Sequence, residues 1–301
     1  MEGRVGLRVF TPSLRLSVPL SAAALLLAAA LAIACPFCKV QEPTFAERRE
    51  AATFVGLAEV VGHQGEQTTC RVHQALKGTR ASADDLELRL AELAALRPGA
   101  LAVLLEGPAW SAIPVTEISA AYFARAPGLR LPASARLPYF ARYLEHAEPA
   151  VAADAYAEFA RAAVDEVAQV AGQVPMPALR RWLVDPDVPG PRKGLYGLLA
   201  GLAPAADDRT ANAEVLHTVI TTPASDFRAG FDGVLAGYLL LAGERGLDEL
   251  TARLIADPEA SPADVRHLLA ALRFYVEFGT AIPTTRIAAA VRPLLARPEI
   301  A

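Results

Sequence analysis

A pattern that returns about every 36 residues dominates the second half of the chain. Its first marker is Gly-Leu-Leu-Ala-Gly at 197–201, which returns as Gly-Val-Leu-Ala-Gly at 233–237 and as His-Leu-Leu-Ala-Ala at 267–271. The second marker is an apolar residue three positions before a proline, and its prolines are Pro186, Pro223, Pro258 and Pro298. Two markers with one period predict stacked helical hairpins, in which each proline follows the second helix of a hairpin.

The period and the Ala- and Leu-rich composition resemble HEAT-type helical repeats, which implies an extended surface for a partner. We expect Gly197, Gly233 and His267 at equivalent positions on successive first helices, where glycine permits close contact between helices. The expected helices span residues 150–171, 177–184, 192–202, 211–220, 231–242, 247–256, 263–278 and 284–295.

The residues from 52 to 119 follow a shorter, strand-like pattern. Apolar runs separated by Gly and Pro turn signals predict strands over residues 52–61, 68–76, 86–90, 101–105 and 113–118, with a short helix over 91–96. Five strands with a helix between the third and the fourth form the arrangement of an OB barrel. The sequence therefore predicts an α+β chain of two domains.

The predicted boundaries follow from this change of pattern. We expect a signal peptide at residues 1–34, a small five-stranded OB-like barrel at 35–119, a linker at 120–135 and an all-α helical-repeat domain at 136–301.

The barrel region also resembles a known module. The motifs are Ala-Thr-Phe-Val-Gly-Leu-Ala at 52–58, Cys-Arg-Val-His-Gln-Ala-Leu-Lys-Gly at 70–78 and Arg-Pro-Gly-Ala-Leu-Ala-Val-Leu-Leu at 97–105, after an N-terminal Cys motif. They resemble the netrin module of tissue metalloproteinase inhibitors, although this chain has fewer cysteines and begins with Cys-x-x-Cys. The resemblance implies that the free amine and carbonyl of an unmodified Cys35 chelate the zinc of a protease.

The N-terminus has the layout of a secretory leader. Three arginines precede an uncharged run over residues 18–34, and small residues, Ala32 and Ala34, occupy the positions that a signal peptidase reads. Cleavage before Cys35 is expected; a retained anchor is the alternative, because the run only just reaches spanning length. A Cys after the cut resembles the lipobox of bacterial lipoproteins, which implies an acyl chain on Cys35 as the membrane attachment.

The charge balance limits the partners. The formal net charge is −4, and removal of the leader would make it more negative. Since nucleic-acid binding requires a basic stripe, we expect no nucleic-acid partner. The sequence contains no Gly-x-Ser-x-Gly, phosphate loop or His-Glu-x-x-His motif, so it supports no hydrolase or nucleotide-binding class and no cofactor is expected.

The cysteines Cys35, Cys38 and Cys70 are odd in number. If Cys35 is lipidated, Cys38 and Cys70 remain as a pair; otherwise the Cys35-Pro-Phe-Cys38 loop can close on itself. Strand alternation places Cys70 on the apolar face, as a small core residue or a disulfide partner. Cys-x-x-Cys is also compatible with a redox dithiol. No metal is expected, since no second ligand pair occurs at zinc spacing.

Asp154 and Glu158 are four residues apart in a predicted helix, so their carboxylates share one face, with Glu145 and His146 one helix earlier. This arrangement is compatible with an acidic or acid–base site. The simpler interpretation, which we expect, is a solvated face with Arg161 as a neighbour. We likewise expect His63 and His73 to have no functional partner.

The whole chain after the leader, with Arg-Leu-Pro-Tyr-Phe-Ala-Arg-Tyr-Leu-Glu-His at 136–146 and Asp-Ala-Tyr-Ala-Glu-Phe-Ala at 154–160, resembles uncharacterised exported proteins of planctomycete-type bacteria that begin Cys-Pro-Phe-Cys. That resemblance implies architecture and compartment. We expect a non-enzymatic binding or scaffold protein of the periplasm or cell envelope that binds a protein partner. A thiol-disulfide oxidoreductase and a metalloprotease-inhibitor-like module are the alternatives.

Overall fold

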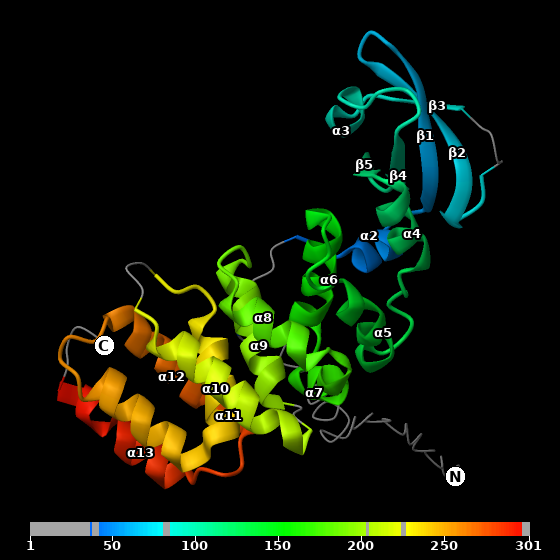
Figure 1. Cartoon of the computed structure of the whole chain (residues 1–301). Coiled ribbons are helices and arrows are strands. Elements are labelled where there is room, and N and C mark those ends of the chain that lie inside the picture. Colours follow the sequence, from blue (N-terminus) through cyan, green and yellow to red (C-terminus); the bar gives the residue numbers. More distant parts are fainter. Residues whose placement is uncertain (1–36, 38–41, 81–84, 203–204, 224–226, 297–301) are drawn as a thin grey trace, which may run out of the picture. The chain divides into compact units, whose positions relative to one another are not determined.

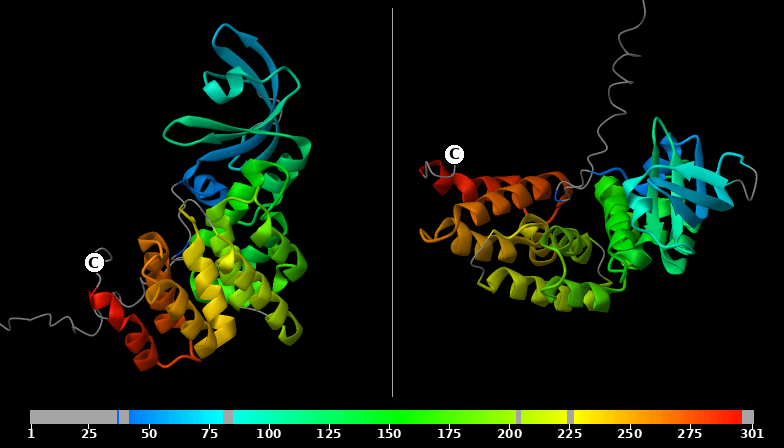
Figure 2. Two further views of the ribbon diagram at one scale, coloured as in Figure 1. Left: turned by 60° about the vertical axis from the view of Figure 1, so that its left-hand side comes forward. Right: turned by 90° about the horizontal axis from the view of Figure 1, so that it is seen from above.

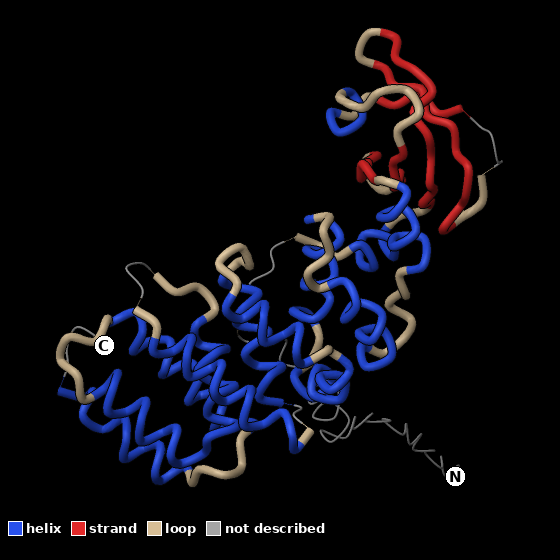
Figure 3. Tube along the Cα trace, in the orientation of Figure 1, coloured by secondary structure: helices blue, strands red, loops and turns tan. Residues whose placement is uncertain are grey.

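A computed structural model of the chain describes residue 37 and residues 42–80, 85–202, 205–223 and 227–296. The predicted leader, Cys35 and Cys38 lie outside the described residues, so cleavage, lipidation and the fate of these cysteines stay predictions. Over those same ranges, no helix has both the length and the apolar character that crossing a bilayer requires. The fold is α+β: the strands precede residue 116 and helices dominate the rest (Figure 3).

The strands form one open antiparallel sheet in the order β3-β2-β1-β4-β5 (Figure 1). They are β1 (Phe54–Gln64), β2 (Gln67–Lys77), β3 (Asp85–Leu88), β4 (Leu101–Glu106) and β5 (Trp110–Val115). The sequence predicted all five strands and the short helix between the third and the fourth, α3 (Ala91–Ala94). The expected end of the fifth strand was wrong, because the Thr116 hydroxyl accepts hydrogen bonds from the Ile118 and Ser119 amides and starts a helix.

The sheet has apolar residues on both faces. One face packs on Leu93 of α3, which is fully buried, and this smaller core also contains Phe54, Val60 and Cys70. On the other face of the sheet, Val55 of β1 and Val103 of β4 belong to the larger core, which continues through the helices. Side chains alternate between the two faces of a strand, so β1 and β4 each supply both cores.

Two helices pack on the Val55 side of the sheet: α2 (Phe45–Ala51) and α4 (Glu117–Arg125). The rings of Phe45 and Phe123 meet edge to face with centroids 4.8 Å apart. The predicted linker 120–135 contains the end of α4 and the start of α5 (Ala133–Phe140). The described residues, from 37 to 296, belong to one compact unit, and the boundary between two domains stays a prediction.

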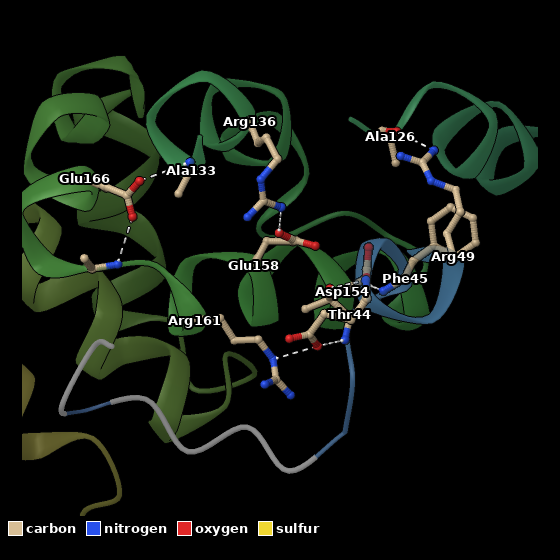
Figure 4. Close-up of polar contacts among 12 residues, drawn as sticks. Thr44, Phe45, Arg49, Ala126, Ala133, Arg136, Asp154, Glu158, Arg161 and Glu166 are labelled. Carbon is tan, nitrogen blue, oxygen red and sulfur yellow. Dashed lines mark hydrogen bonds and ion pairs between the residues drawn. The ribbon is translucent and has the colours of Figure 1, made fainter. Parts of the chain in front are cut away.

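The single helix expected over residues 150–171 was wrong. The chain forms α6 (Pro149–Arg161) and α7 (Val164–Val170), separated by an extended Ala162 (φ −76°, ψ 150°). The Glu166 carboxylate holds this break, because it accepts hydrogen bonds from the amides of Ala163 and Ala133 (Figure 4). A side chain that caps the second helix thus competes with continuation of the first.

The remaining helices follow the predicted order of hairpins. They are α8 (Met176–Val184), α9 (Gly190–Leu202), α10 (Ala206–Thr221), α11 (Phe231–Leu250), which continues as one π-helical turn (Thr251–Ile255), α12 (Pro262–Phe278) and α13 (Thr284–Val291). Gly243, at φ 57° and ψ −137°, breaks α11 into two parts. The two separate helices predicted over residues 231–242 and 247–256 are therefore confirmed.

First and second helices of the hairpins alternate along the chain. The first helices α9, α11 and α12 contact one another in that order, and the second helix α10 contacts both α8 and α11 (Figure 2). Pro186, Pro223 and Pro258 follow second helices, as predicted, whereas Pro298 lies outside the described residues.

The glycines mark one close contact between α9 and α11. A Cβ built on Gly197 would lie 2.6 Å from Val234 Cα, and one built on Gly237 would meet the Gly197 carbonyl. Gly233 faces the preceding helix α9, just as His267 of α12 faces Asp232 of α11 at 3.7 Å. Gly197 faces the following helix, so its expected equivalence with Gly233 and His267 was wrong.

Candidate functional site

Asp154 lies on the face of α6 that is covered by α2 and α4. Its Oδ1 accepts a hydrogen bond from the Phe45 amide at 2.6 Å, and its Oδ2 accepts one from the Tyr122 hydroxyl at 2.6 Å. Burial raises the pKa of the Asp154 carboxyl, although both donors oppose the shift. The solvated face expected for this residue was wrong, because α2 packs on α6 across 109 residues of sequence.

Glu158, one turn along α6, is 1% exposed and forms a buried ion pair with Arg136 of α5 (Figure 4). Burial raises the pKa of the Glu158 carboxyl, and the Arg136 guanidinium opposes that shift. Removal of one member of such a pair leaves an uncompensated charge in the core. Both carboxylates that the sequence singled out are thus engaged by groups of the chain itself.

Arg161 extends the same face toward the N-terminal segment. Its guanidinium pairs with Glu47 at 3.1 Å and donates to the Glu42 carbonyl at 2.8 Å. Glu47 in turn accepts a hydrogen bond from the Thr44 amide at 2.8 Å, in a capping box at the start of α2. This face of α6 therefore anchors residues 42–51 to the helices.

His146 does not join these carboxylates. Its Nδ1 accepts a hydrogen bond from the Glu148 amide at 3.1 Å, whereas Glu145 pairs with Arg192 at 3.1 Å and accepts a bond from the Tyr196 hydroxyl. Within the described part of the chain, no three His, Cys, Asp or Glu side chains are placed to hold a metal ion. The predicted acidic site is a structural network.

Cys70 is a fully buried free thiol in the smaller core, at the position that strand alternation predicted. Burial raises the pKa of the thiol to about 11, which disfavours the reactive thiolate. The two histidines of the sheet have partners that the sequence did not reveal. His63 contacts Thr68 and the Leu96 carbonyl, and His73 pairs with Glu59 at 2.9 Å, all within the sheet region.

A groove of about 780 Å³ lies between α10 and α11. Polar and charged side chains from both helices line it together with a few apolar ones: Arg209, Thr210, Ala213, Glu214, His217, Thr218, Tyr238, Leu241, Ala242, Arg245 and Glu249. Sequence reasoning assigned no role to any of these residues.

The two walls of the groove run in a regular register. Arg209 donates to the Leu241 carbonyl at 3.4 Å, His217 pairs with Glu249 at 2.6 Å, and Arg253 donates to the Thr221 carbonyl at 3.1 Å. The partners in each contact are 32 residues apart. In this constant register α10 runs beside the end of the first part of α11, then its second part, and then the π-helical turn. Alignment of the proline markers could have predicted that these two helices are neighbours, but not which of their side chains face each other.

In the groove, the carboxylate of Glu249 has partners within the chain, whereas two arginines have no described carboxylate partner. Both carboxylate oxygens of Glu249 are engaged, one by His217 and the other by the Tyr238 hydroxyl at 2.6 Å. Burial and this carboxylate raise the pKa of Tyr238 to about 12, while Arg245 opposes the shift. Among the described residues, Arg209 and Arg245 have no carboxylate within 4.0 Å. Guanidinium groups in this state can bind an acidic ligand in a forked, two-bond geometry.

No family model, curated protein or solved structure matches the chain. The α10–α11 groove is therefore the candidate functional site on geometric grounds: it combines a concave surface with charged side chains that the fold itself leaves available.

Proposed function

We propose that this chain is an exported, non-enzymatic binding protein of the cell envelope whose stacked helices bind a protein partner. The observation that carries the proposal is the groove between α10 and α11, with arginines that no described carboxylate neutralises. Stacked hairpins build surfaces of this kind, because each pair of neighbouring second helices leaves a channel between them.

The finer fold assignments are part of the same proposal. Alternating first and second helices and the constant 32-residue register across the groove support a HEAT-like array. The strand order β3-β2-β1-β4-β5, with α3 between the third and the fourth strand, supports an OB-like barrel that stays open between β3 and β5. The netrin-like relationship rests on the sequence motifs.

Export and membrane attachment are proposed from the leader and from Cys35. The intact mass of the mature N-terminus tests both. Cleavage before Cys35 with an added acyl mass supports a lipid anchor, whereas an unmodified Cys35 contradicts the anchor and makes the dithiol and zinc-chelating alternatives chemically open.

Site-specific photocrosslinking in the native host tests the partner surface. A benzophenone side chain in place of Thr218, exposed in the groove, should yield a discrete protein adduct. The same side chain in place of Arg266, exposed on α12, serves as the matched control and should not yield it. Adducts of equal yield from both positions, or none from Thr218, would contradict the proposal.

A further inference from the structure

Resting on the proposed partner surface, we propose that the groove between α10 and α11 binds an acidic segment of the partner, whose carboxylates pair with Arg209 and Arg245. The groove then recognises a short peptide stretch rich in Asp or Glu. The inference comes from a comparison of three neighbouring spaces between second helices.

In the space on one side, an arginine is matched within the chain. Arg180 of α8 contacts Asp208 of α10 at 2.8 Å and the Asn212 side-chain oxygen at 2.8 Å. In the space on the other side, Arg286 of α13 contacts Asp248 at 2.7 Å and Glu244 at 3.7 Å, both in the second part of α11. In both spaces, the guanidinium of an arginine on one helix meets a carboxylate on the neighbouring second helix.

The middle space breaks this rule. Arg209 reaches only the Leu241 backbone carbonyl, and no described carboxylate lies within 4.0 Å of Arg245. Glu249, which could match them, is held by His217 and Tyr238. Arg253 likewise reaches only a backbone carbonyl, that of Thr221. The groove itself is thus lined by two guanidinium groups, those of Arg209 and Arg245, without the carboxylate that each neighbouring space supplies.

The spacing of the two arginines indicates what they accept. In the 32-residue register Arg245 lies opposite Ala213, four residues after Arg209 on α10. Four helical residues correspond to about 6 Å along the groove. Alternate residues of an extended peptide are spaced by about 6.7 Å, so acidic side chains separated by one residue can reach both arginines.

One side chain of the groove opposes such a ligand. Glu214 is exposed beside Ala213, and it can compete with the ligand for Arg245. The whole chain also has a net charge of −4, so it exerts no general attraction for acidic peptides. The preference must therefore arise at the two arginines, and removal of Glu214 should strengthen it.

Fluorescence anisotropy on the full chain tests the inference with two labelled peptides, an alternating Glu-Ser decamer and its Gln-Ser counterpart. The native chain should bind the acidic peptide about tenfold more tightly, since charge-assisted pairs are stronger than neutral ones. Arg209→Gln combined with Arg245→Gln should abolish the preference. Glu214→Gln should increase it, and the matched control Arg266→Gln should leave it unchanged.

Equal affinity of the native chain for both peptides would overturn the inference, and so would a preference that survives in the double arginine variant. All substituted side chains are exposed, and circular dichroism verifies that each variant is folded. If the Thr218 crosslink forms but the acidic preference is absent, the acidic ligand is wrong and the partner surface stands. If Thr218 gives no crosslink, the proposed function itself fails.

Discussion

The α6 face and the α10–α11 groove both gather charged residues, but they differ in where the opposite charges come from. On α6, Asp154, Glu158 and Arg161 find their partners in α2, α4 and α5. Glu158 is buried, Asp154 is half-buried and Arg161 is exposed. In the groove, Arg209 and Arg245 face a channel without a described acidic partner. Charges that are paired within the chain indicate a structural role, and arginines that meet no described carboxylate at a concave surface indicate binding.

The comparison gives a physical criterion that residue type alone cannot supply. In a sequence, two carboxylates four residues apart suggest a chemical site. Here both oxygens of Asp154 accept hydrogen bonds from the chain, and Glu158 is paired with Arg136. In a sequence, an arginine in a solvent-exposed helix suggests no site. Here Arg209 and Arg245 line a groove and meet no described carboxylate. The following predictions test the two sides of this comparison, from the largest expected effect to the smallest.

Removal of the Glu158 charge should produce the largest loss of stability. Glu158→Gln leaves the Arg136 guanidinium buried beside a neutral side chain, and we expect a decrease in the free energy of unfolding of about 3 kcal/mol or more. Denaturant unfolding measures it. Arg136→Met combined with Glu158→Leu should recover much of the loss, because the pair is then replaced by apolar side chains. A single variant within about 0.5 kcal/mol of the native chain would contradict a structural role.

Gly237→Ala tests whether the wall of the groove is fixed by the contact between α9 and α11. The added methyl group would meet the Gly197 carbonyl, so the helices must separate, at an expected cost of about 2–3 kcal/mol. Gly172→Ala is the matched control, because nothing lies within 4 Å of its added Cβ, and it should change stability by less than about 0.5 kcal/mol. Equal melting temperatures for the two variants would mean that α9 and α11 are not in close contact.

Asp154→Asn should have a smaller and pH-dependent effect, of about 1–2 kcal/mol near pH 4. Burial raises the pKa of Asp154 above its unfolded value, so the folded chain retains a proton that the unfolded chain has released. The stability that this residue contributes is complete below about pH 4 and is lost as the pH rises through the raised pKa. Since asparagine does not titrate, the advantage of the native chain over the variant should shrink as the pH rises.

Unfolding curves collected across that range measure the difference. An advantage that grows with pH would show that the folded chain stabilises the ionised form of Asp154, and would contradict the assigned direction.

Glu249→Gln should have the smallest effect on stability, below about 1 kcal/mol, because the pair with His217 is partly exposed to solvent. The comparison with Glu158→Gln is direct, since both substitutions remove a carboxylate charge from a helix. A loss as large as that of Glu158→Gln in thermal unfolding would place Glu249 among the structural charges and remove the distinction between the two regions.

Local sequence signals were sufficient for much of the fold. Turn residues and alternation identified the five strands and α3, and the repeat predicted separate helices on either side of Gly243. The break at Ala162 escaped prediction because it depends on the Glu166 side chain, which also binds Ala133 of another helix.

The site could not be predicted in the same way. The burial of Asp154 depends on an amide 109 residues away in sequence, and no local pattern reports that contact. The groove depends on a register of 32 residues between α10 and α11, whereas the markers repeat at 35 to 37 over the same region. That difference is about one helical turn, which is enough to assign the wrong facing side chains.

Hydrogen exchange of the full chain, with and without the alternating Glu-Ser decamer, tests the central claim most directly. The account predicts added amide protection in residues 206–221 and 238–250, which form the groove, and no change in residues 149–161, which form α6. Protection of 149–161 without protection of the groove would contradict it, because the acidic peptide would then act at the region that the structure assigns to internal support.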